Sequence, residues 1–335
     1  MRTVLGVDAG ASKTHALVAD EAGHALGFGQ GGTANHQVCG LDEAMNQIAR
    51  AVEAAMAEAG QAPGGLEAGC FCLAGADLPE DYAMLQEAIQ ARGWARSVIL
   101  KNDTPAALRA GTSRPWGVVV ICGTGFNAAG RARDGREIIL PGLGAISGDW
   151  GGGHELGMET IRQVMRAWDG REKPTLLTDR VLQTFEAPSV EALLQRLYHG
   201  EIDQRQVMDL VPLVFEVAQA GDEVARELIQ RMGTEVGVTA NALIRRLSLE
   251  TEEVEVVLGG SVFKGKGPLL IDTVQAMVRG IAPRARIVLP RREPVVGATL
   301  MALEAIGVRT DETLEQELEA SLPPRLRIAR EDQED

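Results

Sequence analysis

Apolar runs and turn residues follow the same order in two separate stretches of the chain, at residues 3–29 and 117–140. Each stretch begins with an apolar strand, a glycine-containing turn and a second short strand. A tight turn then leads to a third strand, at Glu21-Ala22-Gly23 in the first stretch and at Arg133-Asp134-Gly135 in the second. The repeated order predicts two copies of one three-strand unit.

Helical periodicity follows each three-strand set, with apolar residues at positions i, i+3 and i+4. After the first set we predict helices at 41–56, 79–92 and 105–111, with strands at 69–73 and 97–100. After the second set we predict strands at 254–258 and 285–289, and helices at 154–168, 175–185, 190–199, 204–220, 222–249, 267–280 and 294–306. This alternation predicts a duplicated α/β domain. We expect the charged segment 309–335, which contains Pro323-Pro324, to fray at its end.

Charge and hydropathy exclude several classes of partner. The net charge is −14, from 33 basic and 47 acidic residues, and the basic residues form no cluster. Such a surface repels a phosphate backbone, so we expect no nucleic-acid partner. No apolar stretch approaches the ~18 residues that span a bilayer, and the strand-like start predicts no signal peptide. We therefore expect a cytoplasmic protein without a membrane partner.

The four cysteines do not form a pattern typical of a disulfide framework or a metal site. Cys70 and Cys72 alternate in an apolar run, so a strand would point both to one face, where disulfide geometry is rare. Neither they nor Cys39 and Cys122 form a Cys-x-x-Cys motif. We interpret all four as small buried hydrophobic residues in a reducing compartment.

The first glycine-containing turn resembles a P-loop but lacks two of its features. No glycine precedes Lys13, and the residues that follow are expected to form a strand rather than a helix. A hairpin turn whose backbone N–H groups and hydroxyls face a phosphate fits better. The residues predicted to contact the nucleotide here are Gly10, Ala11, Ser12, Lys13 and Thr14. Lys13 either neutralises phosphate or is solvated, and Asp8, at the end of the first strand, can hold Mg²⁺ through water.

Two further glycine sites follow predicted strands. Gly123-Thr124-Gly125 repeats the first turn in the second three-strand set, and either forms a plain hairpin or a second phosphate contact. Gly259-Gly260-Ser261 follows a buried strand, where glycine permits close approach of a ligand; a plain strand-to-helix connection is the alternative. Two such turns in register favour a nucleotide site.

Asp103 is the candidate catalytic residue. It follows the apolar strand 97–100 and precedes a helix that begins near Pro105. Ligands bind at the carboxyl ends of strands in open α/β sheets, so its carboxylate can receive a proton from a substrate hydroxyl. By itself, however, the local sequence favours a helix N-cap formed by Asp103 or Thr104.

The order and spacing of these motifs resemble the sugar kinase, heat-shock and actin ATPase superfamily. The chain is similar in particular to eukaryotic-type N-acetylglucosamine kinases and their bacterial relatives in the BadF/BadG/BcrA/BcrD ATPase family, up to about residue 306. The resemblance implies two RNase H-like domains that flank a nucleotide and sugar cleft, use of ATP and Mg²⁺, a small-molecule sugar substrate and a homodimer. It implies an N-terminal domain over 1–115, a C-terminal domain with a helical insertion over 116–296, and a helix returning to the first domain plus a tail over 297–335.

The same resemblance assigns roles to individual positions. It favours Asp103 as general base, and it places ATP contacts at Ser12, Thr124 and Gly260. It implies sugar contacts at Asn35, Phe126, Asn127, Gly142, Leu143, Gly144 and Asp149, as well as Asp103. Asp149 also fits the role of a turn residue in a glycine-rich loop.

Two departures from the family pattern concern the predicted sugar pocket. Asp149 is followed by Trp150-Gly151, where some sugar kinases have Asp-Glu-Gly, and Leu143 stands where others have an aromatic residue. Trp150 can offer a stacking surface to the sugar or can be part of the core.

Together these features predict an ATP-dependent kinase that phosphorylates an amino sugar, N-acetylglucosamine or glucosamine. One alternative is an activator ATPase of a dehydratase or reductase system, but Cys122 is the only thiol near the second glycine turn, and an iron–sulfur cluster needs several. The other is a non-catalytic sugar-sensing protein, against which the presence of both Asp8 and Asp103 argues.

Overall fold

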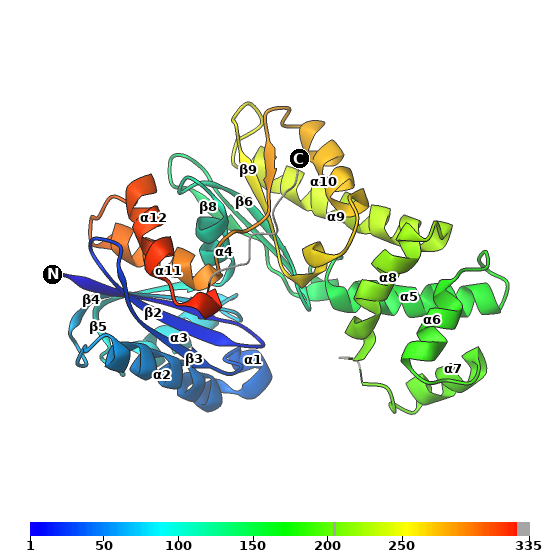
Figure 1. Ribbon diagram of the computed structural model, residues 1–335, viewed down its shortest axis with the longest axis horizontal. Helices are drawn as coiled ribbons and strands as arrows, with labels where there is room; N and C mark the ends of the chain where they lie inside the picture. Colours follow the sequence, from blue (N-terminus) through cyan, green and yellow to red (C-terminus); the bar gives the residue numbers. More distant parts are fainter. Residues whose placement is uncertain (204–205, 327–335) are drawn as a thin grey trace. The chain divides into compact units, whose positions relative to one another are not determined.

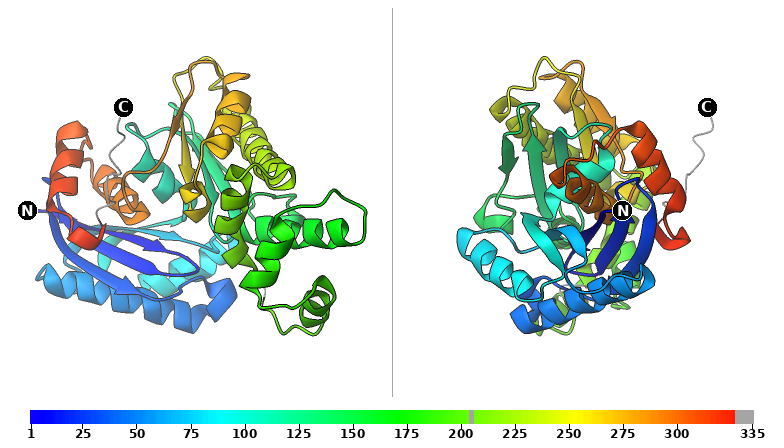
Figure 2. Two further views of the ribbon diagram at one scale, coloured as in Figure 1. Left: turned by 45° about the vertical axis from the view of Figure 1, so that its right-hand side comes forward. Right: turned by 90° about the vertical axis from the view of Figure 1, so that its left-hand side faces the viewer.

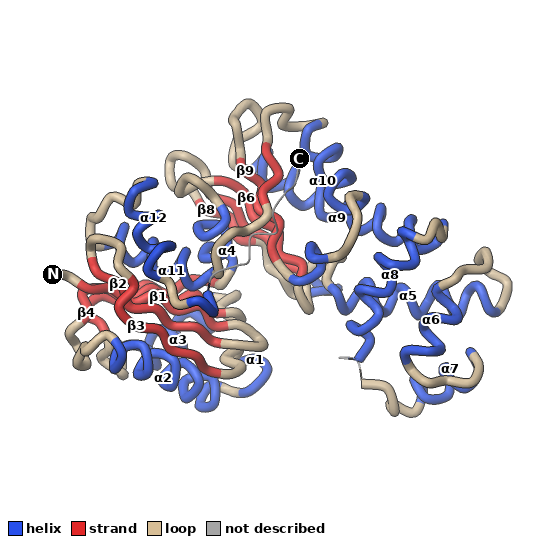
Figure 3. The backbone as a smooth tube through the Cα atoms, viewed as in Figure 1, coloured by secondary structure: helices blue, strands red, loops and turns tan. Residues whose placement is uncertain are grey.

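The computed structural model describes residues 1–203 and 206–326, which form two compact units (Figure 1). Unit 1 comprises Met1–Gly117, Arg133–Gly135 and Val288–Asp335, and unit 2 comprises Val118–Ala132 and Arg136–Ile287. Each unit contains one five-stranded sheet. Helices pack on the sheets (Figures 2 and 3). The prediction of a duplicated α/β fold is confirmed. The predicted domain limits, 1–115, 116–296 and 297–335, stay a prediction.

The sheet of unit 1 has the strand order β3-β2-β1-β4-β5. Strands β1, β2 and β3 form an antiparallel meander, while β4 and β5 continue the sheet parallel to β1. The bounds of the strands are β1 Thr3–Ala9, β2 Thr14–Asp20, β3 Ala25–Gly31, β4 Leu66–Leu73 and β5 Ala95–Asn102. Because β1, β4 and β5 run parallel, their carboxyl ends lie at one edge of the sheet.

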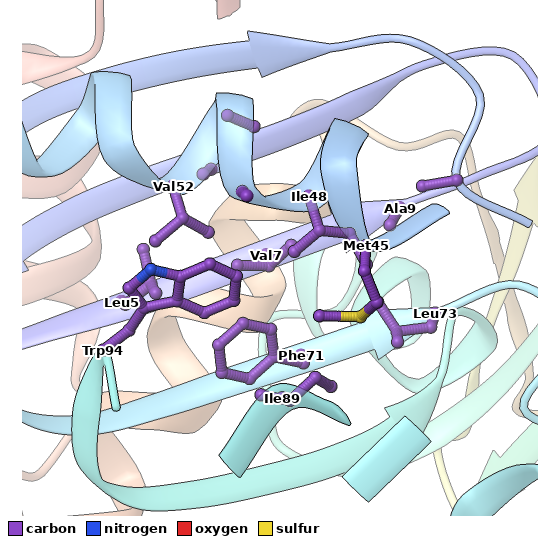
Figure 4. Packing of buried hydrophobic residues seen from close by; sticks show 14 of the residues in the cluster. Leu5, Val7, Ala9, Met45, Ile48, Val52, Phe71, Leu73, Ile89 and Trp94 are labelled. Atoms are coloured by element: carbon purple, nitrogen blue, oxygen red, sulfur yellow. The ribbon is translucent and has the colours of Figure 1, made fainter. Parts of the chain in front are cut away.

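Helices cover both faces of this sheet (Figure 3). On one face, α2 packs over a fully apolar cluster in which Phe71 stacks on Trp94 at 5.9 Å between ring centroids (Figure 4). On the other face, α11 and α12 cover Val4, Leu17 and their neighbours. The helices of unit 1 are α1 His36–Cys39, α2 Leu41–Glu58, α3 Pro79–Gln90, α4 Thr104–Gly111, α11 Pro294–Ala305 and α12 Glu312–Ser321.

Three alternate glycines of β3 explain how closely α2 lies on the sheet. A Cβ atom at Gly27, Gly29 or Gly31 would stand 2.2, 1.8 or 2.3 Å from a backbone carbonyl oxygen of α2. Real Cβ atoms do not approach other atoms so closely, so these positions exclude any side chain. The pattern Gly-Phe-Gly-Gln-Gly thus encodes a helix–sheet contact made by backbone atoms.

Unit 2 contains a second sheet, of order β10-β9-β6-β7-β8. Its strands are β6 Gly117–Cys122, β7 Phe126–Arg131, β8 Glu137–Ile139, β9 Glu255–Gly259 and β10 Arg286–Val288. Its α-helices are α5 Gly153–Trp168, α6 Leu177–Thr184, α7 Val190–Tyr198, α8 Leu210–Gln219, α9 Glu223–Arg246 and α10 Leu269–Arg279. Short 3₁₀ helices occupy Gly144–Ile146, Gln206–Asp209 and Ser261–Lys264.

One expectation needs correction, and one helix was not predicted. The single helix predicted over 204–220 is divided: a 3₁₀ turn at Gln206–Asp209 precedes α8, which places Pro212 in the first turn of that helix, where proline lacks no needed N–H. The tail predicted from residue 309 contains α12 and a 3₁₀ turn, Pro324–Leu326. Leu314 and Leu318 are buried against the sheet, and a four-residue repeat continues through residues 322 and 326. The predicted fraying concerned the chain end at 327–335, which lies outside the described residues.

The cysteines are all free thiols, as expected. Cys70 and Cys72 point to the same face with 3.7 Å between their Sγ atoms, and both are buried with Cys122. Cys39 departs from the expectation, since it is only partly buried. Within the described part of the chain, no helix is long and apolar enough to cross a membrane.

Candidate active site

Two carboxylates predicted to act on substrate and metal lie at the same edge of the unit 1 sheet. In the parallel ladder, Asp8 of β1 is in register with Cys72 of β4, and Leu73 of β4 is in register with Asn102, the last residue of β5. Asp103 directly follows Asn102. The fold therefore brings together the ends of β1 and β5, with the end of β4 between them.

The side chain of Asp103 does not cap the helix that follows it. It stands at the N-cap position of α4 but accepts no capping hydrogen bond in the described structure. The carboxamide of Asn102 takes that role, because its Oδ1 accepts from the Thr104 backbone N at 3.0 Å and from Thr104 Oγ1 at 2.6 Å. Asp103 Oδ1 is buried and has no hydrogen-bond partner among the described residues. A buried, unpaired acceptor is rare in folded proteins and calls for an explanation, of which a catalytic role is one.

Both carboxylates have a raised pKa. Burial, followed by the charge of Asp77, raises the pKa of Asp103 to about 6, against the opposing effect of nearby backbone N–H groups. Burial, followed by the charge of Asp103, raises the pKa of Asp8 to about 7, while Lys13 acts in the opposite direction. Carboxylates that gain or lose a proton near neutral pH are suited to general-base work and mark functional sites.

Asp77 and Asn102 also belong to this edge and were not predicted from the sequence. Asn102 Nδ2 donates to Asp77 Oδ1 at 3.0 Å, and Gln37 Nε2 donates to Asp77 Oδ2 at 3.2 Å. Burial is the main cause of the raised pKa of Asp77. The signal was available, because Asp77 follows β4 closely, as Asp103 follows β5.

Asn35 reaches the same edge from the loop after β3. Its Oδ1 accepts from the Gln37 backbone N at 2.9 Å and so caps α1. The same Oδ1 lies 2.7 Å from the position of a Cβ on Gly75, which has a φ of +87°. Turn chemistry is therefore present at Asn35, and its predicted contact with sugar stays a prediction.

The first glycine turn joins β1 to β2 as a closed hairpin. Gly10 N donates to the Lys13 carbonyl oxygen at 2.9 Å. Thr14 is fully buried and its hydroxyl donates to the Gly32 carbonyl oxygen at 2.8 Å, whereas Ser12 is exposed. Of the two hydroxyls predicted to face a phosphate, only Ser12 is accessible in this conformation. Lys13 Nζ donates to Glu293 Oε2 at 2.6 Å, so this cation is ion-paired rather than only solvated.

In unit 2, the second and third glycine sites lie side by side. Strands β6 and β9 are parallel, and Gly260, which follows β9, has a φ of +100°. A Cβ at Gly260 would stand 2.2 Å from the carbonyl oxygen of Cys122, the residue before Gly123. The carbonyls of Gly123 and Thr124 also accept from the first backbone N–H groups of α5, at 2.8 and 3.1 Å. Backbone atoms from three elements therefore meet at this turn.

The residues predicted to line the sugar pocket of unit 2 come from β7 and from the loop that follows β8, and several of them are in contact. A Cβ at Gly142 would stand 2.9 Å from the Asn127 carboxamide, and Phe126 packs in the same way against Gly151. Asp149 Oδ2 accepts from Gly144 N at 2.9 Å and from the hydroxyl of Ser147. The Asp149 carboxylate thus has the turn role that its sequence context allowed.

The remaining two positions discussed for this pocket differ in exposure. Leu143 is 38% exposed in the same loop. Trp150 is partly buried, and the Arg231 guanidinium lies 4.3 Å from the centroid of its ring. This cation–π contact occupies one face of the indole, so in this conformation that face is not open to a sugar.

The duplicated fold and its glycine turns are typical of an ATPase family. The chain belongs to the BadF/BadG/BcrA/BcrD ATPase family, whose model matches residues 5–302. Within known proteins it is similar to the N-acetylmuramic acid/N-acetylglucosamine kinase of Clostridium acetobutylicum, with 26% identity over 90% of this chain and 98% of that protein. It is also similar to the N-acetyl-D-glucosamine kinase of Dictyostelium discoideum, with 28% identity over 90% of this chain and 98% of that one.

A solved structure gives the same picture of the fold. A candidate N-acetylglucosamine kinase from Chromobacterium violaceum matches with a TM-score of 0.68 and 25% identity, over 90% of this chain and 99% of that chain. The predicted actin-like sugar kinase fold is confirmed.

Proposed function

We propose that this protein is an ATP-dependent kinase that phosphorylates an amino sugar, N-acetylglucosamine or glucosamine. The observation that carries the proposal is Asp103: a carboxylate with a buried, unpartnered oxygen and a pKa raised to about 6, at the carboxyl ends of parallel strands. The named relatives are kinases of such sugars, and the similarity extends over most of this chain.

In the proposed reaction, Asp103 accepts the proton of the sugar hydroxyl as its oxygen attacks the γ-phosphorus of ATP. A new oxygen–phosphorus bond forms, the bond between the γ-phosphorus and the β,γ-bridging oxygen breaks, and ADP leaves. The proton remains on Asp103 until the product dissociates. Because the pKa is near 6, the carboxylate is ionised at neutral pH and still basic enough to share the proton.

We assign the nucleotide contacts to backbone groups of the glycine turns. The turns at 10–14, 123–125 and 259–261 provide backbone N–H groups and small residues, which permit close approach of phosphates. Ser12 adds an accessible hydroxyl. Neutralisation of the β- and γ-phosphate charge by Mg²⁺ is the chemistry that the metal supplies when bound.

Asp8 is the residue that would hold Mg²⁺. Its carboxylate is buried, and burial together with Asp103 raises its pKa to about 7, so a nearby cation would stabilise its ionised form. Among residues 1–203 and 206–326 there is no cluster of three or more metal-ligating side chains. One carboxylate with waters and phosphate oxygens suits Mg²⁺, which is seldom enclosed by protein alone.

A coupled assay of ADP release tests the proposal. The purified protein is given ATP, Mg²⁺ and, in separate reactions, N-acetylglucosamine, glucosamine, N-acetylmannosamine, N-acetylmuramate or glucose. We expect turnover with at least one of the first two sugars and its loss in Asp103→Asn. Absence of sugar-dependent ADP release with every sugar would refute the kinase function, and wild-type turnover by Asp103→Asn would remove Asp103 as the base.

The activator ATPase alternative has a separate test. Cys122 is fully buried in β6, and burial raises its pKa well above the usual range, which opposes the thiolate that a cluster requires. Iron analysis and a visible spectrum of anaerobically purified protein decide the matter. Stoichiometric iron with a charge-transfer band would favour the activator over the kinase.

We further propose a homodimer, as the family resemblance implies, located in the cytoplasm, as we expect from the sequence. Light scattering coupled to size-exclusion chromatography distinguishes a dimer from the monomer of 35.7 kDa. A single species at the monomer mass at micromolar concentration would remove the dimer from the proposal.

A further inference from the structure

Helix α12 carries a buried carboxylate that joins two other segments of unit 1. Glu315 Oε1 accepts from Arg109 Nη2 at 2.7 Å, and Glu315 Oε2 accepts from Arg292 Nη1 at 2.7 Å. The side chains of Glu315 and Arg109 are 8% and 4% exposed, and that of Arg292 is 17% exposed. One carboxylate therefore holds two guanidinium groups from different parts of the chain, away from water.

Arg109 depends on this contact because its charge is deeply buried. Its other partners are Glu304 Oε1 at 2.8 Å and Thr310 Oγ1 at 2.9 Å, and its Nη1 has no partner among the described residues. A guanidinium that is always charged cannot respond to a lost partner by deprotonation. Removal of the Glu315 charge would leave a buried cation incompletely paired, which favours movement of the segment that carries it.

One of the two joined segments carries Asp103. Arg109 lies on α4, and α4 begins at Thr104, immediately after Asp103. The contact between α4 and α11 is tight, since a Cβ at Gly297 would stand 2.0 Å from the Ala106 carbonyl oxygen. A helix packed through backbone atoms moves as a unit, so the bond at Arg109 helps to fix where the carboxylate of Asp103 is presented.

The other joined segment reaches the first glycine turn. Arg292 immediately precedes Glu293, whose Oε2 accepts from Lys13 Nζ at 2.6 Å. Glu293 is the N-cap residue of α11. The bond from Arg292 to Glu315 therefore restrains the position of Glu293, which is bonded to Lys13. Lys13 lies in the turn to which we assign nucleotide contacts.

We propose that Glu315 is a positioning residue for phosphoryl transfer: through Arg109 it places Asp103, and through Arg292 and Glu293 it places Lys13. This inference rests on the proposed kinase function for its effect on rate. The structural part, that one carboxylate of α12 couples two segments of the candidate site, is tested without turnover.

The test compares Glu315→Gln with Glu317→Gln. Both substitutions remove one negative charge from α12 without changing side-chain shape, but Glu317 is exposed. Each variant is assayed for sugar-dependent ADP release at a temperature at which circular dichroism shows it fully folded. Hydrogen–deuterium exchange is measured in peptides that cover residues 10–14, 103–111 and 290–297.

For Glu315→Gln we expect kcat to fall roughly tenfold to a hundredfold, because small displacements of a catalytic group are costly. We also expect faster hydrogen–deuterium exchange in all three peptides of Glu315→Gln. For Glu317→Gln we expect kcat and exchange rates equal to those of the wild type. If the kinase proposal is wrong, no variant shows turnover, but the exchange result still decides whether Glu315 couples the two segments. Wild-type exchange outside α12 together with wild-type kcat in folded Glu315→Gln would overturn the inference.

A second variant keeps the test decisive if Glu315→Gln does not fold. Arg292→Met removes the bonds that Arg292 makes to Glu315 and, at 3.5 Å, to Glu319, and it leaves the bond between Glu315 and Arg109 in place. We expect it to raise KM for ATP and exchange in residues 10–14, while exchange in 103–111 stays at the wild-type rate. Equal loosening of both segments, or of neither, in Arg292→Met would contradict the two separate connections through Glu315.

Discussion

Replacing Asp103 with Asn should reduce activity and increase stability at the same pH. The substitution keeps the size of the side chain and removes the group that we propose takes the proton. A general base contributes a factor of roughly 10² to 10⁴ to the rate, so kcat should fall by that factor. Because the same carboxylate is costly to ionise in its buried position, its removal should also stabilise the folded chain.

The size of the stability effect follows from the pKa. The folded pKa is about 6 and the usual value is 3.8. The folded protein therefore holds this proton more tightly than the unfolded chain does, and the resulting stability is lost as the pH rises through 3.8 to about 6. Above that range the ionised Asp103 costs up to about 3 kcal/mol relative to a neutral residue of the same shape. The residue is partly exposed, which makes this figure an upper bound.

Urea unfolding at a series of pH values from 4 to 8 measures the effect, with ADP release recorded at pH 8. The stability gained by Asp103→Asn should be near zero at pH 4 and largest above pH 7. Asp42→Asn, at an exposed position on α2, serves as the control and should show no such growth with pH. An equal gain at pH 4 and pH 8, or a loss at both, would refute the view that burial of the Asp103 charge sets its pKa.

Three other substitutions test the glycine contacts and the first turn. Gly29→Ala should lower the unfolding midpoint strongly or prevent folding, since its Cβ would stand 1.8 Å from the carbonyl oxygen of Ala51; an unchanged midpoint in thermal unfolding would contradict this contact. Gly260→Ala should weaken ATP binding measured by calorimetry, because its Cβ would clash with the backbone of Cys122 and because residue 260 has a φ of +100°. Wild-type affinity for ATP would show that this turn does not contact the nucleotide. Lys13→Met should change the free energy of unfolding by less than about 1 kcal/mol, since the ion pair of Lys13 is partly exposed. The same substitution should raise KM for ATP. An unchanged KM would show that Lys13 does not neutralise phosphate.

Much of the fold could be predicted from local sequence because each element carries its own periodicity. The meander β1–β3 and its copy β6–β8 are marked by turns with strong chemistry, and α2 by a regular apolar face. Helix α12 was missed because its charged residues dominate the composition of its segment. Its apolar residues recur every fourth position, and burial against α11 and the sheet, which local sequence does not reveal, selects the helix.

The candidate site was predictable where a residue's place on a strand determines its surroundings. Asp8 lies one residue before the end of β1, and Asp103 directly follows β5. Parallel strands of one sheet have their carboxyl ends at the same edge, so the proximity of the two residues follows from topology. The hydrogen bond between Asn102 and Asp77 depends on the side-chain conformations of both residues. The spacing of residues in the sequence does not predict those conformations. The same holds for the capping role that passes from Asp103 to Asn102.

The two copies of the strand meander have diverged in the chemistry at their carboxyl ends. In unit 1 that edge carries Asp8, Asp77 and Asp103, all with raised pKa values caused first by burial. In unit 2 the corresponding edge carries glycines 123, 125 and 260, with backbone groups in close contact. Proton transfer requires a titratable side chain, whereas backbone N–H groups alone can bind a phosphate. In the proposed kinase reaction, unit 1 contributes the proton acceptor Asp103 together with a phosphate turn at 10–14, whereas the contribution that we assign to unit 2 is backbone contact with phosphate.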